Sequence, residues 1–93
     1  MRIEFFKSKT CVKCPTVKKV LEEELAARGL KYSEVVVEKY IENPDNLTDL
    51  MMYDELEVPF LVFRKNGKEV YLSSQQLKGD IREKIASVLE AFL

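Results

Sequence analysis

Histidine is absent from this chain of 93 residues. Its absence excludes general acid–base catalysis by imidazole, cysteine–histidine dyads and any zinc site with imidazole ligands. Glycine and proline are sparse, with three of each, while apolar residues make up 46% of the chain. That composition is typical of a globular protein rather than a disordered one. Because such a length suffices for one core and is too short for two, we expect a single domain over residues 1–93.

The sequence also lacks a basic block and a long apolar run. Its 15 Lys and Arg residues nearly balance its 16 Asp and Glu residues. Nucleic acid is therefore not an expected partner, because neutralising phosphates requires clustered cations. No apolar run approaches the roughly 20 residues that a transmembrane helix needs, so we expect no membrane partner. The first residues carry Arg2 and Glu4 in a strand-like pattern, without the apolar core of a secretion signal, which predicts a cytoplasmic protein.

The two cysteines of the chain lie together in the segment Cys11-Val12-Lys13-Cys14-Pro15. A lone pair without a secretion signal indicates a reactive dithiol in a reducing compartment rather than a structural staple. The run from Met1 to Lys7 predicts a strand, and the run from Pro15 to Arg28 predicts a helix with apolar residues on one face. The first thiol therefore falls near a helix N-terminus, where free N–H groups and the helix dipole favour a thiolate.

The chemistry of such a pair assigns a different role to each sulfur. Cys11 is expected to be the more exposed, attacking thiolate. Cys14, in the first helical turn, is expected to be the resolving thiol. The alternative for Cys11 is a buried small apolar residue, since free cysteine often lies inside proteins. The rate of exchange depends on the thiolate fraction, the nucleophilicity and the pKa of the leaving thiol together.

The rest of the chain alternates between strand and helix patterns. Gly29 is well placed to end the first helix, and the acidic run from Glu22 to Glu24 is interpreted as its solvated face. A second strand is predicted at Tyr32–Val37, followed by a helix that begins at Asn43-Pro44 and has Leu47, Leu50 and Met51 on its inner side. Strands at Phe60–Phe63 and Glu69–Leu72 are predicted to be joined by a hairpin turn at Asn66-Gly67. The last predicted element is a terminal helix with apolar residues at helical spacing: Leu77, Ile81, Ile85, Val88, Leu89 and Phe92. The order is βαβαββα.

That order, with Cys-x-x-Cys after the first strand and Val58-Pro59 opening the third, resembles the thioredoxin–glutaredoxin superfamily. The Phe63–Gly67 hairpin is similar to a turn of thioredoxins, and the resemblance covers essentially the whole chain. Only ten residues precede Cys11, and in this respect the sequence is more similar to small glutaredoxin-like or archaeal-type thioredoxin-like proteins. The resemblance implies an α/β thioredoxin fold, in which a four-stranded mixed sheet is flanked by three helices. It also implies that the first two strands are parallel and that the hairpin is antiparallel.

The same resemblance implies roles for residues around the thiols. In the family the proline matching Pro59 is cis and belongs to the catalytic site, and Val58 would offer its backbone to an extended substrate chain. Proline also commonly opens an edge strand, which is the alternative for Pro59. The expected substrate-binding residues are Thr10, Val12 and Lys13 beside the thiols, together with Val58.

Some positions depart from the family pattern. The buried aspartate of thioredoxins falls on Phe5, and only Lys78-Gly79-Asp80 partly matches the segment with which glutaredoxins hold glutathione. A protein disulfide is therefore the expected substrate. The charge of Lys13 either favours a thiolate or steers acidic partners. For Lys7 and Lys9 the preferred interpretation is an ordinary solvated surface.

Together these features predict a monomeric thiol–disulfide oxidoreductase that needs no bound cofactor or metal. Its partners would be proteins with disulfides, and a reductase or small thiol that resets the pair. The alternative is an iron–sulfur or metal-binding module, in which Cys11 and Cys14 supply half of the ligands and a second molecule supplies the rest. A third hypothesis is a non-catalytic interaction domain, for which Cys11→Ser would leave function unchanged.

Overall fold

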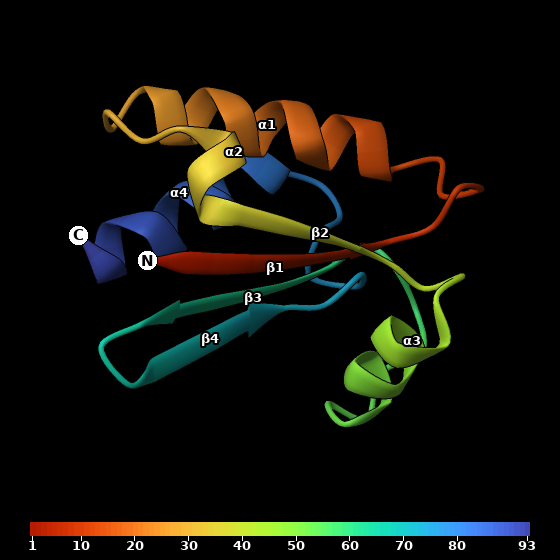
Figure 1. Ribbon diagram of the computed structural model, residues 1–93. Helices are drawn as coiled ribbons and strands as arrows, with labels where there is room; N and C mark the ends of the chain where they lie inside the picture. The colour runs from red at the N-terminus through yellow and green to blue at the C-terminus, as the bar shows by residue number, and fades with distance from the viewer.

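Four strands form one mixed sheet. The computed structural model describes residues 1–93 (Figure 1). Its elements are β1 Arg2–Lys7, α1 Cys14–Ala26, α2 Tyr32–Val35, β2 Val36–Tyr40, α3 Pro44–Met51, β3 Phe60–Lys65, β4 Lys68–Leu72 and α4 Ile81–Phe92. Strand β1 is parallel to β2 and antiparallel to β3, and β3 and β4 form an antiparallel hairpin. The predicted α/β architecture and strand directions are confirmed.

Helices cover both faces of this sheet (Figure 1). Helices α1 and α4 pack on one face, and α3 lies on the other. Strand β1 supplies both interfaces, because successive side chains of a strand point to opposite faces. Ile3 and Phe5 join the large core under α1 and α4, while Phe6 joins a smaller core with Leu50 of α3. Each of these side chains is fully buried, and such burial stabilises the fold by about 1.5–3 kcal/mol per side chain.

The segment Tyr32–Val37 is not one strand, and the prediction was wrong there. Tyr32–Val35 forms the short helix α2, and the strand runs over Val36–Tyr40. Strand β2 begins at Val36 because that residue pairs with Ile3 near the start of β1. Propensity alone predicts a strand through this valine-rich run, but pairing with β1 decides where it starts. The protein therefore has four helices rather than three.

Two further expectations about helices are corrected. Met51 does not face the core, because 53% of its surface is exposed at the end of α3. Leu77 is fully buried but precedes the terminal helix, which begins at Ile81. Asp80 is the N-cap of this helix, and its side chain accepts a 3.1 Å hydrogen bond from the Glu83 N–H.

The acidic run on α1 is also less solvated than expected. Glu24 accepts hydrogen bonds from Arg28, which lies just past the end of α1, and from Arg82 of α4. These charge-assisted bonds, led by the one from Arg82, lower the pKa of Glu24. The run therefore includes a polar link between α1 and α4.

Local turn chemistry agrees with the sequence. Gly29 adopts a φ of 75° after α1, and the Leu30 N–H donates a 2.9 Å hydrogen bond to the Leu25 carbonyl. Asn66 and Gly67 both have positive φ, as the predicted two-residue hairpin requires.

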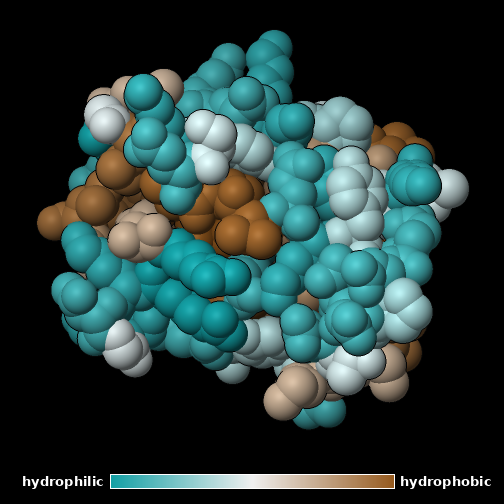
Figure 2. Space-filling model, viewed as in Figure 1, coloured by the Kyte–Doolittle hydropathy of each residue, from teal (hydrophilic) through white to brown (hydrophobic).

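The surface shown in Figure 2 is mostly hydrophilic, with apolar colour gathered around the region of α2 and β2. On the exposed edge strand β2, Val37 keeps 39% of its surface accessible. None of the helices combines the length and the apolar character that crossing a membrane requires.

Candidate redox site

Cys11 and Cys14 are joined by a disulfide, with their Cα atoms 5.5 Å apart. Cys11 lies in the loop after β1, and Cys14 is the first residue of α1. The Cys14 backbone N–H donates a 3.2 Å hydrogen bond to Cys11 Sγ. The sulfur of Cys11 therefore lies at the positive end of α1, where the N–H group and the helix dipole stabilise a negative charge on it once the disulfide is reduced.

The two sulfurs differ in access. Cys14 is 1% exposed and belongs to the large core, whereas Cys11 is only partly buried. Next to Cys11, Val12 is 91% exposed, and Thr10 and Lys13 are also on the surface. This placement agrees with an accessible first sulfur and a deeper second one.

The Val58–Pro59 peptide bond is cis, as the resemblance implied. Pro59 is buried and Val58 is partly exposed just before β3. The next residue, Phe60, pairs with Phe6 at the end of β1 from which the cysteine loop departs. The sheet register therefore brings the proline segment and the cysteine loop to the same end of the sheet (Figure 1).

A third loop, between β4 and α4, completes this end of the sheet. Its Leu77 carbonyl accepts a 3.1 Å hydrogen bond from Lys13 Nζ. Its Ser74 hydroxyl donates a 2.8 Å hydrogen bond to the carboxylate of Glu57, which lies just before the proline segment. The loop is thus tied to both predicted parts of the site. These links could not be predicted from the sequence, since no local pattern pairs residues 64 and 17 positions apart.

The expectation that Lys7 lies on a solvated surface is wrong. Lys7 is only 8% exposed, and its ammonium lies 5.0 Å from the centre of the Phe5 ring and 5.2 Å from that of Tyr40. It pairs with Glu38 of β2 at 3.5 Å. The cause is the alternation of β1, which turns Lys7 to the same face as Phe5. Lys9, by contrast, is exposed as expected.

Glu38 is the centre of a small polar cluster beside α1. It accepts a 2.5 Å hydrogen bond from the Tyr32 hydroxyl and pairs with Lys18 at 3.5 Å as well as with Lys7. Burial by itself would raise the pKa of Glu38, but the Tyr32 hydrogen bond and the two ammonium groups together lower it. Burial, reinforced by the bond to Glu38, raises the pKa of Tyr32 far above its usual value.

A cavity of about 300 Å³ opens beside the disulfide. It brings the sulfurs together with the end of β1 and with β2. Its lining residues are Lys7, Ser8, Lys9, Cys11, Cys14, Pro15 and Tyr40.

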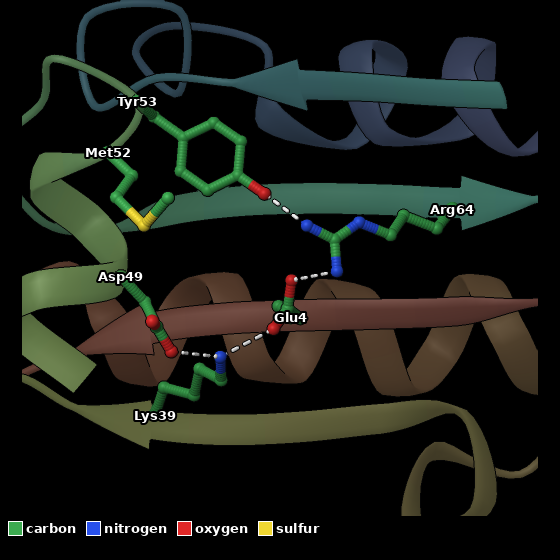
Figure 3. A pocket seen from close by; sticks show the side chains of 6 residues that line it. All are labelled: Glu4, Lys39, Asp49, Met52, Tyr53 and Arg64. Carbon is green, nitrogen blue, oxygen red and sulfur yellow. Dashed lines mark hydrogen bonds and ion pairs between the residues drawn. The ribbon is translucent and has the colours of Figure 1, made fainter. Parts of the chain in front are cut away.

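A second cavity, of about 430 Å³, lies on the α3 face of the sheet (Figure 3). The carboxylate of Glu4, 4% exposed, lies 2.5 Å from Lys39 of β2 and 2.7 Å from Arg64 of β3. Lys39 also pairs with Asp49, and Arg64 donates to the hydroxyl of Tyr53. Every buried polar side-chain atom of the protein has a partner. These charges therefore hold α3 against the sheet, on the face opposite to Phe5 and the dithiol.

The side chains offer little for a metal ion. Nowhere do three or more Cys, Asp or Glu side chains come together in a way that would hold one. An iron–sulfur or metal centre on Cys11 and Cys14 would need further ligands from a second molecule.

The strand order β2-β1-β3-β4, with helices on both faces and a Cys-x-x-Cys pair at the start of α1, defines a thioredoxin fold. A solved structure that shares it is thioredoxin 1 from the thermophilic eubacterium Thermosipho africanus TCF52B. The match covers 98% of this chain and 97% of that chain, with a TM-score of 0.67 and 18% sequence identity. No family model matches the sequence, and no curated protein matches it. The structural likeness establishes the fold.

Proposed function

We propose that this protein is a thiol–disulfide oxidoreductase that reduces protein disulfides through the Cys11–Cys14 couple. One observation carries the proposal: a partly exposed sulfur, Cys11 Sγ, lies at the N-terminus of α1 and is bonded to a buried partner three residues on. The partly exposed sulfur can attack a disulfide of another molecule, and a thiol of another molecule can attack it. The buried one is placed to form the internal disulfide again.

The reaction transfers two electrons from the protein to its substrate. The Cys11 thiolate attacks one sulfur of a substrate disulfide, so that a mixed disulfide forms and the first substrate thiolate leaves. The Cys14 thiol then loses its proton to solvent or to that thiolate, and its sulfur attacks Cys11 Sγ. The second substrate thiolate leaves, and the Cys11–Cys14 disulfide remains. A reductase, or two molecules of a small thiol, returns the two electrons.

The neighbouring residues supply contacts for the substrate in this proposal. Val58, before the cis bond to Pro59, offers its backbone to an extended substrate chain at the same end of the sheet. Thr10 and Val12 flank Cys11 on the surface, and the exposure of Val12 suits an apolar contact with a protein client. With only two cysteines, both in the couple, the protein suits a reducing compartment such as the cytoplasm, and we expect it to work as a monomer.

A trapping experiment tests the proposal. The purified protein, Cys11→Ser and Cys14→Ser are each reduced with dithiothreitol, freed of excess reductant and mixed with insulin as a protein disulfide, and the products are resolved without reductant. Cys14→Ser is expected to accumulate a mixed disulfide, because the resolving sulfur is missing. Cys11→Ser is expected to form none and to lose insulin reduction. Equal turnover of Cys11→Ser and the unmodified protein would instead support a non-catalytic interaction domain.

A redox titration across dithiothreitol buffers gives an independent test. Alkylation and mass spectrometry would count the free thiols at each ratio. We expect one reversible two-electron transition between roughly −180 and −300 mV. A protein that forms no reversible disulfide, or whose thiols co-purify with iron or zinc, would replace this proposal with the metal-site alternative.

A further inference from the structure

Lys7 is buried and lines the same cavity as both redox cysteines. It reaches that place from the last residue of β1, on the face where Cys14 enters the core. The rings of Phe5 and Tyr40 cover it, so that water screens its charge less than that of a surface lysine. None of the exchange steps proposed above uses this cation.

We propose that Lys7 is a positioning residue for the dithiol: its charge stabilises the thiolate of the reduced pair from the sheet side. This inference rests on the proposed function and names a residue that tunes it. The N-terminus of α1 supplies one stabilising influence on Cys11, and Lys7 supplies a second from a different element.

Glu38 sets how much of this charge the sulfurs experience. Its carboxylate pairs with Lys7 and with Lys18 of α1, so one negative charge faces two positive ones. The cluster keeps an excess of positive charge next to the cavity. The charged and titratable groups around Lys7 and the sulfurs are Lys9 and Lys13 of the cysteine loop, Lys18 of α1, Tyr32 of α2, and Glu38 and Tyr40 of β2.

The sign of the effect follows from the charge of Lys7. A nearby cation lowers the free energy of a thiolate and hardly affects a neutral disulfide. Lys7 therefore favours reduction of the Cys11–Cys14 disulfide. In that reaction dithiothreitol gives two electrons to the disulfide and becomes oxidised. Removing the charge should raise the thiol pKa and make the disulfide harder to reduce.

The first test is Lys7→Met, which fills the space between the rings with an uncharged chain of similar length. We expect the midpoint of the pH dependence of Cys11 alkylation, measured on the reduced protein, to rise by about half a unit. Reduction by dithiothreitol above that midpoint should become about threefold less favourable, which is the same change expressed as an equilibrium constant. Lys7→Arg, which keeps the charge, should restore most of both values.

Two matched variants separate the charge from a loss of structure. Lys9→Met removes an exposed lysine from the same cavity and should shift the midpoint far less. Glu38→Gln removes the carboxylate that offsets Lys7 and should shift the midpoint the opposite way, toward lower pH. Circular dichroism and a denaturation midpoint verify that each variant is folded.

The outcomes are decisive for Lys7. Opposite shifts in Lys7→Met and Glu38→Gln, with little change in Lys9→Met, support the proposal. An unchanged midpoint in Lys7→Met, a shift equal to that of Lys9→Met, or shifts of one sign in both cluster variants would overturn it. Alkylation of the reduced protein needs no turnover, so this result stands apart from the outcome of the trapping experiment.

Discussion

The ammonium of Lys13, which lies between the two cysteines in sequence, donates a 3.1 Å hydrogen bond to the Leu77 carbonyl in the loop before α4. This contact joins segments 64 residues apart. The same loop is held to the proline segment through Ser74 and Glu57. Lys13 therefore has a partner within its own chain, which limits the freedom of its charge to steer another molecule.

Replacing Lys13 should loosen the loop that it holds. We expect Lys13→Met to lower the free energy of unfolding by about 1 kcal/mol, because one hydrogen bond is lost at a partly buried site. Amide hydrogen exchange should increase in residues 73–80 and remain unchanged in β1. Lys19→Met, on the exposed side of α1, is the control. Equal protection of the loop in the two variants would show that the bond does not order it.

Val12 should matter for protein clients and not for folding. Because it is 91% exposed, Val12→Ser is expected to change the free energy of unfolding by less than about 0.5 kcal/mol. Reduction of insulin should slow severalfold, whereas reduction of a small aromatic disulfide should not. Val37→Ser, at the partly exposed edge strand, should leave both rates unchanged. A loss with the small disulfide as well would place the effect on the thiol instead of on client contact.

Glu4 should contribute to stability without contributing to redox chemistry. Glu4→Gln leaves the largely buried Lys39 and the partly exposed Arg64 without their shared carboxylate, and we expect a loss of about 2 kcal/mol in the free energy of unfolding. The loss is limited because Lys39 keeps Asp49 and Arg64 keeps Glu69. Urea denaturation measures it.

The control for Glu4 is Glu69→Gln, which removes the exposed partner of Arg64 and should cost under about 1 kcal/mol. Both variants should keep the alkylation midpoint of Cys11, because the cluster lies on the α3 face. A shifted midpoint in Glu4→Gln would show that the two faces of the sheet are coupled.

Tyr32 should make the protein sensitive to alkaline pH. Burial, then the hydrogen bond to Glu38, raises its pKa above the ordinary value of 10.0. The stabilisation is fully present below pH 10 and is lost as the pH rises above it, because the unfolded chain releases the proton first. Tyr32→Phe should flatten this alkaline decline in the free energy of unfolding.

Absorbance at alkaline pH measures the same property directly. Of the four tyrosines, Tyr32 and Tyr53 both have raised pKa values and should ionise late in the folded protein. Tyr32→Phe should remove one of the late-ionising groups. An unchanged number of late-ionising groups would contradict the assignment.

Much of the fold could be predicted because its signals are local. Asn66-Gly67 fixes a hairpin through positive φ angles, and Gly29 ends α1 in the same way. The boundary at Val36 could not be predicted, because pairing with Ile3 determines it and that partner is distant in sequence. The exposure of Met51 likewise depends on how far α3 extends before the chain turns away.

The sequence by itself determined the chemistry of the candidate site: two thiols three residues apart, a strand before them, a helix after them and a proline ahead of β3. These properties depend on residue type and on neighbours within one or two turns. The tertiary structure decided what surrounds the thiols. It buried Lys7 beside them, joined Lys13 to Leu77 and placed Glu4 on the opposite face. These contacts form only when distant parts of the chain pack around a shared core. The pattern of neighbouring residues therefore does not predict them.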